Sequence, residues 1–144
     1  MIKNEKQYRI TKAQARRFGE AIHELESQKR PANITPRLWQ AQRDATGSQL
    51  HELRELVEGY ERLHLGKSRE LMLEAVEDLP KTLIRARIAA GMTQEGLASR
   101  LGVKTQQVQR YEATEYESAS FARICKVVQA LGLRMPNPTR LIRG

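Results

Sequence analysis

Residues 105–110 read TQQVQR, a stretch whose side chains suit hydrogen bonding better than packing. It places three glutamines and one arginine around a single apolar residue, Val108, and contains no carboxylate. Each glutamine offers donors and an acceptor, and arginine offers a planar fork of donors. In the major groove of DNA, glutamine pairs with adenine and arginine with guanine through two hydrogen bonds. The stretch therefore has the chemistry of base recognition, provided that neighbouring elements hold it as an exposed helix face.

The residues before this stretch predict two short helices joined by a tight turn. Thr93 is a suitable N-cap for a helix over 94–101, and Gly102 ends that helix. Three residues, Gly102, Val103 and Lys104, separate it from a second helix that starts at Thr105. A short helix, a turn that contains glycine and a second helix form the helix-turn-helix arrangement, whose second helix enters the major groove of DNA.

The small and apolar residues of this arrangement stand where two crossing helices need them. Ala98 is small enough for a close crossing, and Gly102 adopts a positive φ without strain at the turn. Val108 and Tyr111 are three residues apart, on the side of the second helix that faces the first. The expected core of the motif comprises Ala98, Leu101, Gly102, Val108 and Tyr111. The exposed side is left with Thr105, Gln106, Gln109 and Arg110, and Gln107 lies at its flank.

Two further helices are expected around the motif. One spans 80–90 with Leu83, Ile84 and Ile88 on its apolar side, and Gly91 ends it. The other follows a cap at Ser118 or Ser120 and ends at Gly132. Its apolar positions are Phe121, Ile124, Val127, Val128 and Leu131.

The N-terminal half predicts two longer helices. Residues 11–27 carry an amphipathic stripe, with Thr11 as the expected N-cap. After a loop over 29–35, Thr35 and Pro36 are a favourable cap and first residue for a helix that continues to Leu65. A helix of that length exceeds what a small domain covers, so we expect it to pack on the first helix and on a second copy of itself.

The expected architecture is all-α, with an N-terminal helical hairpin or long helix followed by the helix-turn-helix domain. Sustained strand-like alternation is absent from the sequence. We predict an N-terminal helical segment over 1–66 that serves dimerisation, toxin binding or both. A linker helix over 67–79, capped by Ser68, then leads to the DNA-binding domain over 80–134 and a basic tail over 135–144.

The charge distribution supports a polyanionic partner for the C-terminal half. The net charge of the chain is +8. Residues 79–144 carry 11 basic and 4 acidic side chains, whereas residues 1–78 carry 14 and 13. A concentrated positive field favours nucleic acid, although a solubilising surface has the same composition. Charge alone does not separate these two interpretations.

The sequence lacks the residue patterns that metal binding, catalysis or membrane insertion would require. The single cysteine, Cys125, stands in an apolar helix pattern and is expected to pack as a small core residue. The histidines His23, His51 and His64 are scattered and lack metal-binding spacing, so we expect no metal site, cofactor or enzymatic activity. The chain lacks a long apolar run and begins without a secretory signal pattern. The sequence therefore predicts a cytoplasmic protein without a membrane partner.

Residues 79–133 resemble the Xre/Cro-type helix-turn-helix domain of phage repressors and bacterial regulators, which has the lambda-repressor fold. The similarity lies in LIRARIAAGMTQEGLASRLGVK, in TQQVQRYE and in ICKVVQALGL, whereas YEATEYES departs from relatives that have a glycine soon after the glutamate. The resemblance implies base contacts by Thr105, Gln106 and Gln107, base or phosphate contacts by Gln109 and Arg110, and a DNA-backbone contact by Gln94. Thr93, Arg100 and Lys104 are expected to add phosphate contacts.

The N-terminal half resembles HigA-type antitoxins in IKNEKQY (2–8) and LRELVEGYE (53–61). That resemblance implies neutralisation of a RelE/HigB-like toxin and repression of a shared operon. Ordinary helix packing by Tyr8 and Tyr60 is the alternative interpretation. The sequence thus predicts a homodimeric repressor that binds a palindromic operator on double-stranded DNA, either as the antitoxin of a type II toxin–antitoxin pair or as a stand-alone Xre-family regulator whose N-terminal helices serve dimerisation alone.

Overall fold

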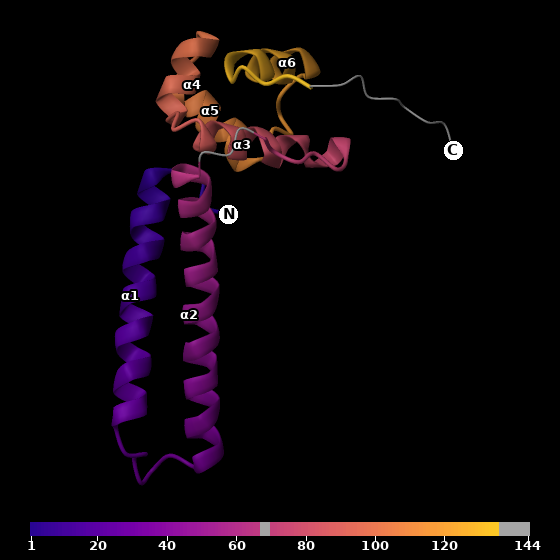
Figure 1. Cartoon of the computed structure of the whole chain (residues 1–144). Helices are drawn as coiled ribbons and strands as arrows, with labels where there is room; N and C mark the ends of the chain where they lie inside the picture. Colours follow the sequence, from indigo (N-terminus) through magenta and orange to yellow (C-terminus); the bar gives the residue numbers. More distant parts are fainter. Residues whose placement is uncertain (67–69, 136–144) are drawn as a thin grey trace, which may run out of the picture. The chain divides into compact units, whose positions relative to one another are not determined.

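The computed structural model describes residues 1–66 and 70–135, and all regular structure within these ranges is helical (Figure 1). This confirms the expected all-α class. The chain divides into two compact units, the first of which is Met1–Gly66. The helices are α1 (Glu5–Ser27), α2 (Pro36–Leu65), the short 3-10 helix η1 (Val76–Asp78), α3 (Leu79–Ala89), α4 (Gln94–Leu101), α5 (Thr105–Ala113) and α6 (Phe121–Ala130). None of the described helices is both long and apolar enough to span a membrane.

The first unit is an antiparallel hairpin of α1 and α2 (Figure 1). The first helix starts earlier than predicted, because Asn4 and not Thr11 is its N-cap. The Asn4 side chain accepts a hydrogen bond from the Gln7 N–H at 2.9 Å, and the Gln7 side chain accepts one from the Lys3 N–H at 2.8 Å. The bond to Asn4 pairs an N–H that the helix start would leave free, and the bond to Gln7 pairs the N–H of the residue before the cap, so Thr11 lies inside the helix.

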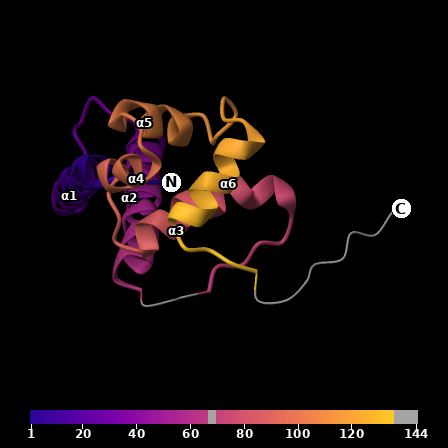
Figure 2. The same ribbon diagram turned by 90° about the horizontal axis from the view of Figure 1, so that it is seen from above.

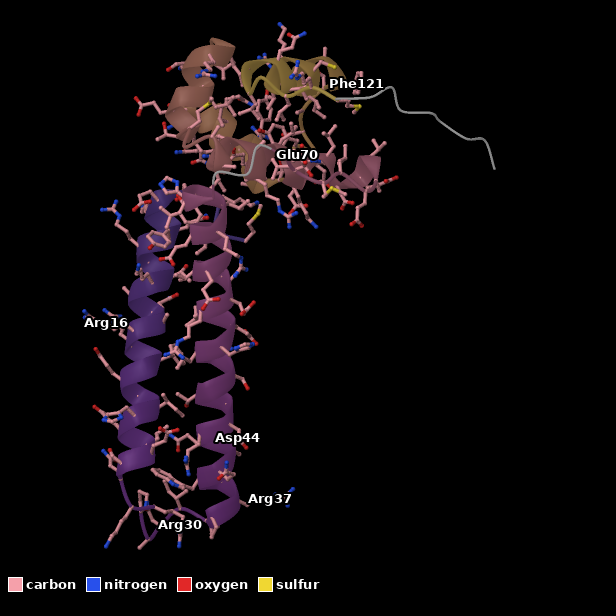
Figure 3. The ribbon with its side chains drawn as sticks, in the orientation of Figure 1. Arg16, Arg30, Arg37, Asp44, Glu70 and Phe121 are labelled. Carbon is pink, nitrogen blue, oxygen red and sulfur yellow. The ribbon has the colours of Figure 1, made fainter. Side chains whose placement is uncertain are left out.

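The second helix begins at the predicted residue, because the Thr35 hydroxyl caps it and Pro36 is its first residue. It ends before Gly66, where a Cβ would lie 2.1 Å from the Arg62 carbonyl oxygen. Leu50, Val57 and Tyr60 are its buried residues. Charged side chains such as those of Arg16 and Arg37 extend outward from the hairpin (Figure 3).

The linker helix predicted over 67–79 is not found in the described residues. Residues 70–75 are not helical, and only the 3-10 turn η1 precedes α3. Ser68, its expected cap, lies outside the described residues. The sequence around Leu71 favours a helix, but Met72 and Val76 are 81% and 71% exposed. A helix this short needs packing to be stable in water, and these side chains find little.

The second unit builds its core from side chains of four helices. The α4 helix contacts both α5 and α6, and the view in Figure 2 shows these helices gathered around α3. Leu97 of α4 is fully buried. The other fully or almost fully buried apolar side chains are Leu83, Ile84, Ile88, Val108 and Val127. Side chains of α3, α4, α5 and α6 therefore contribute to the core.

The last described helix, α6, is capped by the Ser120 hydroxyl, which accepts from the Arg123 N–H at 3.2 Å. Phe121, expected on the apolar side, is instead 78% exposed and lies at the surface (Figure 3). Val127 is the fully buried centre of the apolar stripe, and Phe121 lies at its edge in the first turn. The predicted basic tail, apart from Met135, falls outside the described residues.

Candidate nucleic-acid interface

Local interactions fix both ends of α4, and those at its C-terminal end define the turn to α5. The Thr93 hydroxyl accepts a hydrogen bond from the Gly96 N–H at 2.9 Å and so caps the start of the helix. At the other end Gly102 has a φ of 65°. This left-handed conformation lets the Val103 N–H reach the Ala98 carbonyl at 3.0 Å. The direction in which α5 leaves the turn is therefore set by the backbone.

The inner side of α5 is anchored in the core. Val108 is completely buried, and Ala98 on α4 is 2% exposed. Leu101 is half-buried. Tyr111 is also buried, and its ring stacks on that of Tyr116 at a centroid distance of 5.9 Å. These contacts leave α5 little freedom to rotate about its own axis.

A buried ion pair ties α5 to α3. The Arg87 guanidinium donates to the two carboxylate oxygens of Glu112, from Nε at 2.5 Å and from Nη2 at 2.8 Å. Arg87 Nη1 also donates to the Met92 carbonyl at 2.7 Å. The side chains of Arg87 and Glu112 are 3% and 0% exposed. A bidentate pair of this kind fixes distance and orientation together.

Gln94 joins the same cluster. Its side-chain nitrogen donates to a Glu112 oxygen at 2.8 Å, and the residue is 8% exposed. The Gln94 amide, expected to contact the DNA backbone, thus lies inside the domain. The buried carboxylate of Glu112 accounts for this position, because it needs donors that water cannot supply there.

The sequence contains a signal for this buried cluster that was not among the predictions. Arg87 lies three residues after Ile84 and one before Ile88, on the buried side of α3. Glu112 lies four residues after Val108, on the buried side of α5. Charged side chains are rarely buried unless they are paired with an opposite charge. A basic residue on the buried side of one helix and an acidic residue on the buried side of another therefore indicate an ion pair between the two helices.

The outer side of α5 carries the residues predicted to contact bases. Gln106, Gln109 and Arg110 are exposed, and Thr105 and Gln107 are half-buried at the flanks. Amide and guanidinium groups thus form one continuous polar surface on a helix whose other side is fixed. The arrangement offers donors and acceptors to a groove without first having to order the helix.

The residues expected to contact phosphates flank this surface, and they differ in the hydrogen bonds that their side chains already make. Lys104 is exposed at the N-cap position of α5, where it makes no side-chain capping bond. Arg100 is also exposed, but its Nη1 donates to the Ala130 carbonyl at 2.9 Å at the end of α6. Thr93 is exposed as well, with its hydroxyl engaged as a cap. Within residues 93–113 the exposed charges are those of Arg100, Lys104, Arg110 and Glu95, so the surface is net positive.

The loop after α5 explains the departure of YEATEYES from its relatives. Glu115 and Tyr116 have φ values of 48° and 62°, the left-handed conformation that glycine adopts most easily. The Tyr116 side chain offsets this strain by burial, since it is 3% exposed and stacks on Tyr111. Its hydroxyl has no hydrogen-bond partner among the described residues, and burial raises the pKa of the phenol.

Comparison with known families agrees with this geometry. Residues 83–142 match the helix-turn-helix family model. A domain of this kind binds DNA. No curated protein and no solved structure gives a significant match to the chain.

Proposed function

We propose that this protein is a transcriptional repressor that binds a specific operator as a homodimer and reads it with α5. The observation that carries the proposal is the combination of a polar outer face and a fixed inner face on this one helix. Gln106, Gln109 and Arg110 are exposed, while Val108 and Glu112 are completely buried. A helix held in this way loses little conformational freedom on entering the groove.

Sequence would be read mainly by the first turns of α5. Thr105, Gln106 and Gln107 stand at the N-terminal end, which in helix-turn-helix proteins contacts base edges. Gln109 and Arg110 lie one turn further along and would reach bases or phosphates there. The preferred partners are adenine for glutamine and guanine for arginine.

The phosphate backbone would be contacted on either side of this helix. Lys104 is the best-placed cation, since it is exposed and directly precedes α5. Arg100 would have to leave the Ala130 carbonyl, so its contribution should be smaller. At the start of α4, Thr93 and the backbone N–H of Gln94 offer donors to a phosphate, whereas the Gln94 side chain is held by Glu112.

A homodimer would match a palindromic operator, with two copies of α5 in successive major grooves about 34 Å apart. A monomeric domain of this size reads too few base pairs for high selectivity. The N-terminal hairpin forms a compact unit of its own, and we assign dimerisation to it.

A second candidate function is that of an antitoxin whose hairpin binds a RelE/HigB-like toxin. The two segments that carry this resemblance meet in the structure, an arrangement that ordinary helix packing by Tyr8 and Tyr60 would also give. Tyr8 stacks on Tyr60 at 5.0 Å, and the Tyr8 hydroxyl donates to Glu61 at 2.5 Å. Co-expression with the product of an adjacent small gene tests this role: a stable complex would support it, and failure to bind would refute it.

Fluorescence anisotropy tests the main proposal. The full chain is titrated onto duplex DNA from upstream of its own gene and onto a shuffled duplex of equal length and composition. We expect the native sequence to be bound at least about 10³-fold more tightly at physiological salt. Equal affinities would refute sequence-specific binding, and the absence of binding to either duplex would refute the DNA-binding role.

A further inference from the structure

The outward side of α1 carries a cluster of basic side chains. Residues 6–17 contain five basic residues and no acidic one. One of the five, Lys12, is already held by the Glu61 carboxylate of α2 at 3.0 Å. The other four are exposed, and we call them the basic face: Lys6, Arg9, Arg16 and Arg17.

The helical repeat places these four residues on the side of α1 that faces away from α2. The half-buried residues of α1, which include Tyr8, Ala15 and Ile22, form the stripe that packs on α2. With 3.6 residues per turn, the four basic residues fall within about 100° of one another on the opposite side of the helix. Figure 3 shows the Arg16 side chain extending away from α2.

Most of this positive charge has no counterion within the hairpin. Among the described residues, no carboxylate lies within ion-pair distance of Lys6, Arg9 or Arg17. Arg16 lies 3.4 Å from Glu20, but the two side chains are 81% and 63% exposed. An exposed pair of this kind contributes little to stability, so Arg16 is free to exchange its partner. The basic face therefore offers its charge to an external anion.

The charges of α1 also run against the preference of an α-helix. The helix dipole favours acidic residues in the first turns and basic residues in the last. Apart from Glu5, the first turns of α1 carry Lys6 and Arg9, and its last turn contains no basic residue. Residues 20–26 instead carry three glutamates. Charges that oppose local stability are expected where a surface serves a partner.

We propose that the basic face contacts the phosphate backbone of the same DNA duplex whose bases α5 reads. This inference rests on the DNA-binding role of the proposed function and adds a sequence-independent contact surface on the hairpin. Lys6 and Arg17 lie about 16 Å apart along the helix axis, which corresponds to about five base pairs of duplex. Guanidinium and ammonium groups at this spacing suit a row of phosphates.

DNA fits this face better than a lipid surface does. A helix that binds a membrane surface inserts its apolar side into the bilayer, whereas the apolar side of α1 packs on α2. DNA held by α5 also presents phosphates to the hairpin at a high effective concentration, because both units belong to one chain.

The salt dependence of DNA binding tests this contact. The full chain and its Lys6→Gln/Arg9→Gln/Arg17→Gln variant are titrated at several salt concentrations onto the duplex from upstream of the gene. If each cation neutralises one phosphate, the plot of log K against log salt should become shallower by about 2.7 per chain in the variant. A slope identical to that of wild type would overturn the proposal.

The matched control removes the same charge from scattered positions of the hairpin. It is Lys29→Gln/Arg37→Gln/Arg54→Gln, and all three positions are exposed. We expect its salt slope to stay close to that of wild type. An equal change in both triple variants would reflect net charge alone and would overturn the proposal. So would an unchanged DNA slope combined with lost binding to phosphatidylserine vesicles, which would assign the face to lipid.

DNA cleavage from a tethered iron chelate locates the contact. Ala13 is exposed between Arg9 and Arg16, so Ala13→Cys in a Cys125→Ser background carries the probe into the middle of the basic face. Ala32→Cys, in the loop that joins α1 to α2, is the control. We expect backbone cuts from position 13 and few from position 32. Absence of cuts from position 13, or equal cutting from both positions, would contradict the proposed contact.

The shuffled duplex separates this inference from the proposed function. If wild type binds the native and shuffled duplexes equally and the basic-face variant still has the shallower slope, specific reading by α5 fails and the basic face stands. If wild type binds the native duplex selectively and the slopes agree, the basic face fails and the repressor function stands. Absence of binding to both duplexes would overturn the two together.

Discussion

The Glu112 carboxylate accepts two hydrogen bonds from the Arg87 guanidinium, at 2.5 and 2.8 Å, across 25 positions of sequence. This contact joins the first helix of the DNA-binding domain to the helix that presents TQQVQR. The same carboxylate accepts from Gln94, so three helices meet at one buried charge. The orientation of the proposed reading surface thus depends on groups that would never touch DNA.

Removing one member of this pair should destabilise the domain severely. Glu112→Ala leaves the Arg87 charge buried and uncompensated, which costs about 3–5 kcal/mol of unfolding free energy. Chemical denaturation followed by circular dichroism measures the loss. Lys81→Ala is the control, because it removes only an exposed contact of 4.0 Å to Glu115 and should cost at most about 1 kcal/mol. If both variants unfold alike, the ion pair does not hold α5.

Gln106→Ala should weaken binding to the operator without affecting the fold. Loss of a bidentate base contact costs about 1–3 kcal/mol, and the base choice at that position should relax. Anisotropy titrations with the operator and its single-base variants provide the measurement. Gln129→Ala, at an exposed position of α6, serves as the control and should bind like wild type. An unchanged affinity for Gln106→Ala would refute its role in reading bases.

Lys104→Ala should weaken binding to every sequence by a similar factor. If the ammonium group neutralises one phosphate, the plot of log K against log salt should become shallower by about 0.9. Titrations at several salt concentrations give this slope. The exposed Lys126 of α6 provides the control, and its substitution by alanine should leave the slope as in wild type. A Lys104→Ala slope identical to wild type would count against the phosphate contact.

The stability of the hairpin should depend on Glu61 in acid. The hydrogen bond from Tyr8 and the adjacent Lys12 lower the pKa of this carboxyl from its ordinary value of 4.5. A lowered pKa contributes stability that is present above pH 4.5 and is lost as the pH falls through the lowered value. Fluorescence of the single tryptophan, Trp39 on α2, reports thermal unfolding at each pH.

Glu61→Gln should therefore be less stable at neutral pH and lose less stability on acidification than wild type. Glu58→Gln on the same helix is the control, because the Glu58 carboxylate lies 3.6 Å from the exposed Arg62 guanidinium and forms only a surface pair with it. Should the acid response of Glu61→Gln match that of wild type, the contact with Tyr8 and Lys12 does not stabilise the hairpin.

Much of the fold follows from local signals. Thr35 and Pro36 predicted the start of α2, and Thr93 and Gly102 are a hydroxyl cap and a left-handed glycine at the two ends of α4. Such residues act within one turn of chain, so their effect can be derived without knowledge of the rest of the molecule. The exposed position of Gln106 follows in the same way from the periodicity of α5.

The remaining features depend on distant partners. Burial of Gln94 follows from Glu112, which is 18 positions away in sequence. The helix predicted from Ser68 to Leu79 had suitable residues, but the described part of that segment finds little to pack against, as the exposure of Met72 shows. Periodicity shows which apolar residues share one face of a helix. It does not show whether another element of the fold covers that face. Phe121 is exposed for the same reason.

Selection of bound fragments from random duplex DNA tests the central claim most directly. If α5 of each copy in a homodimer reads one half-site, the enriched sequences should contain two inverted half-sites whose centres lie about 34 Å apart, one turn of the double helix. The Gln106→Ala protein should enrich the same spacing with one base position relaxed in each half. Recovery of unrelated fragments without a common sequence would contradict sequence-specific reading by this helix.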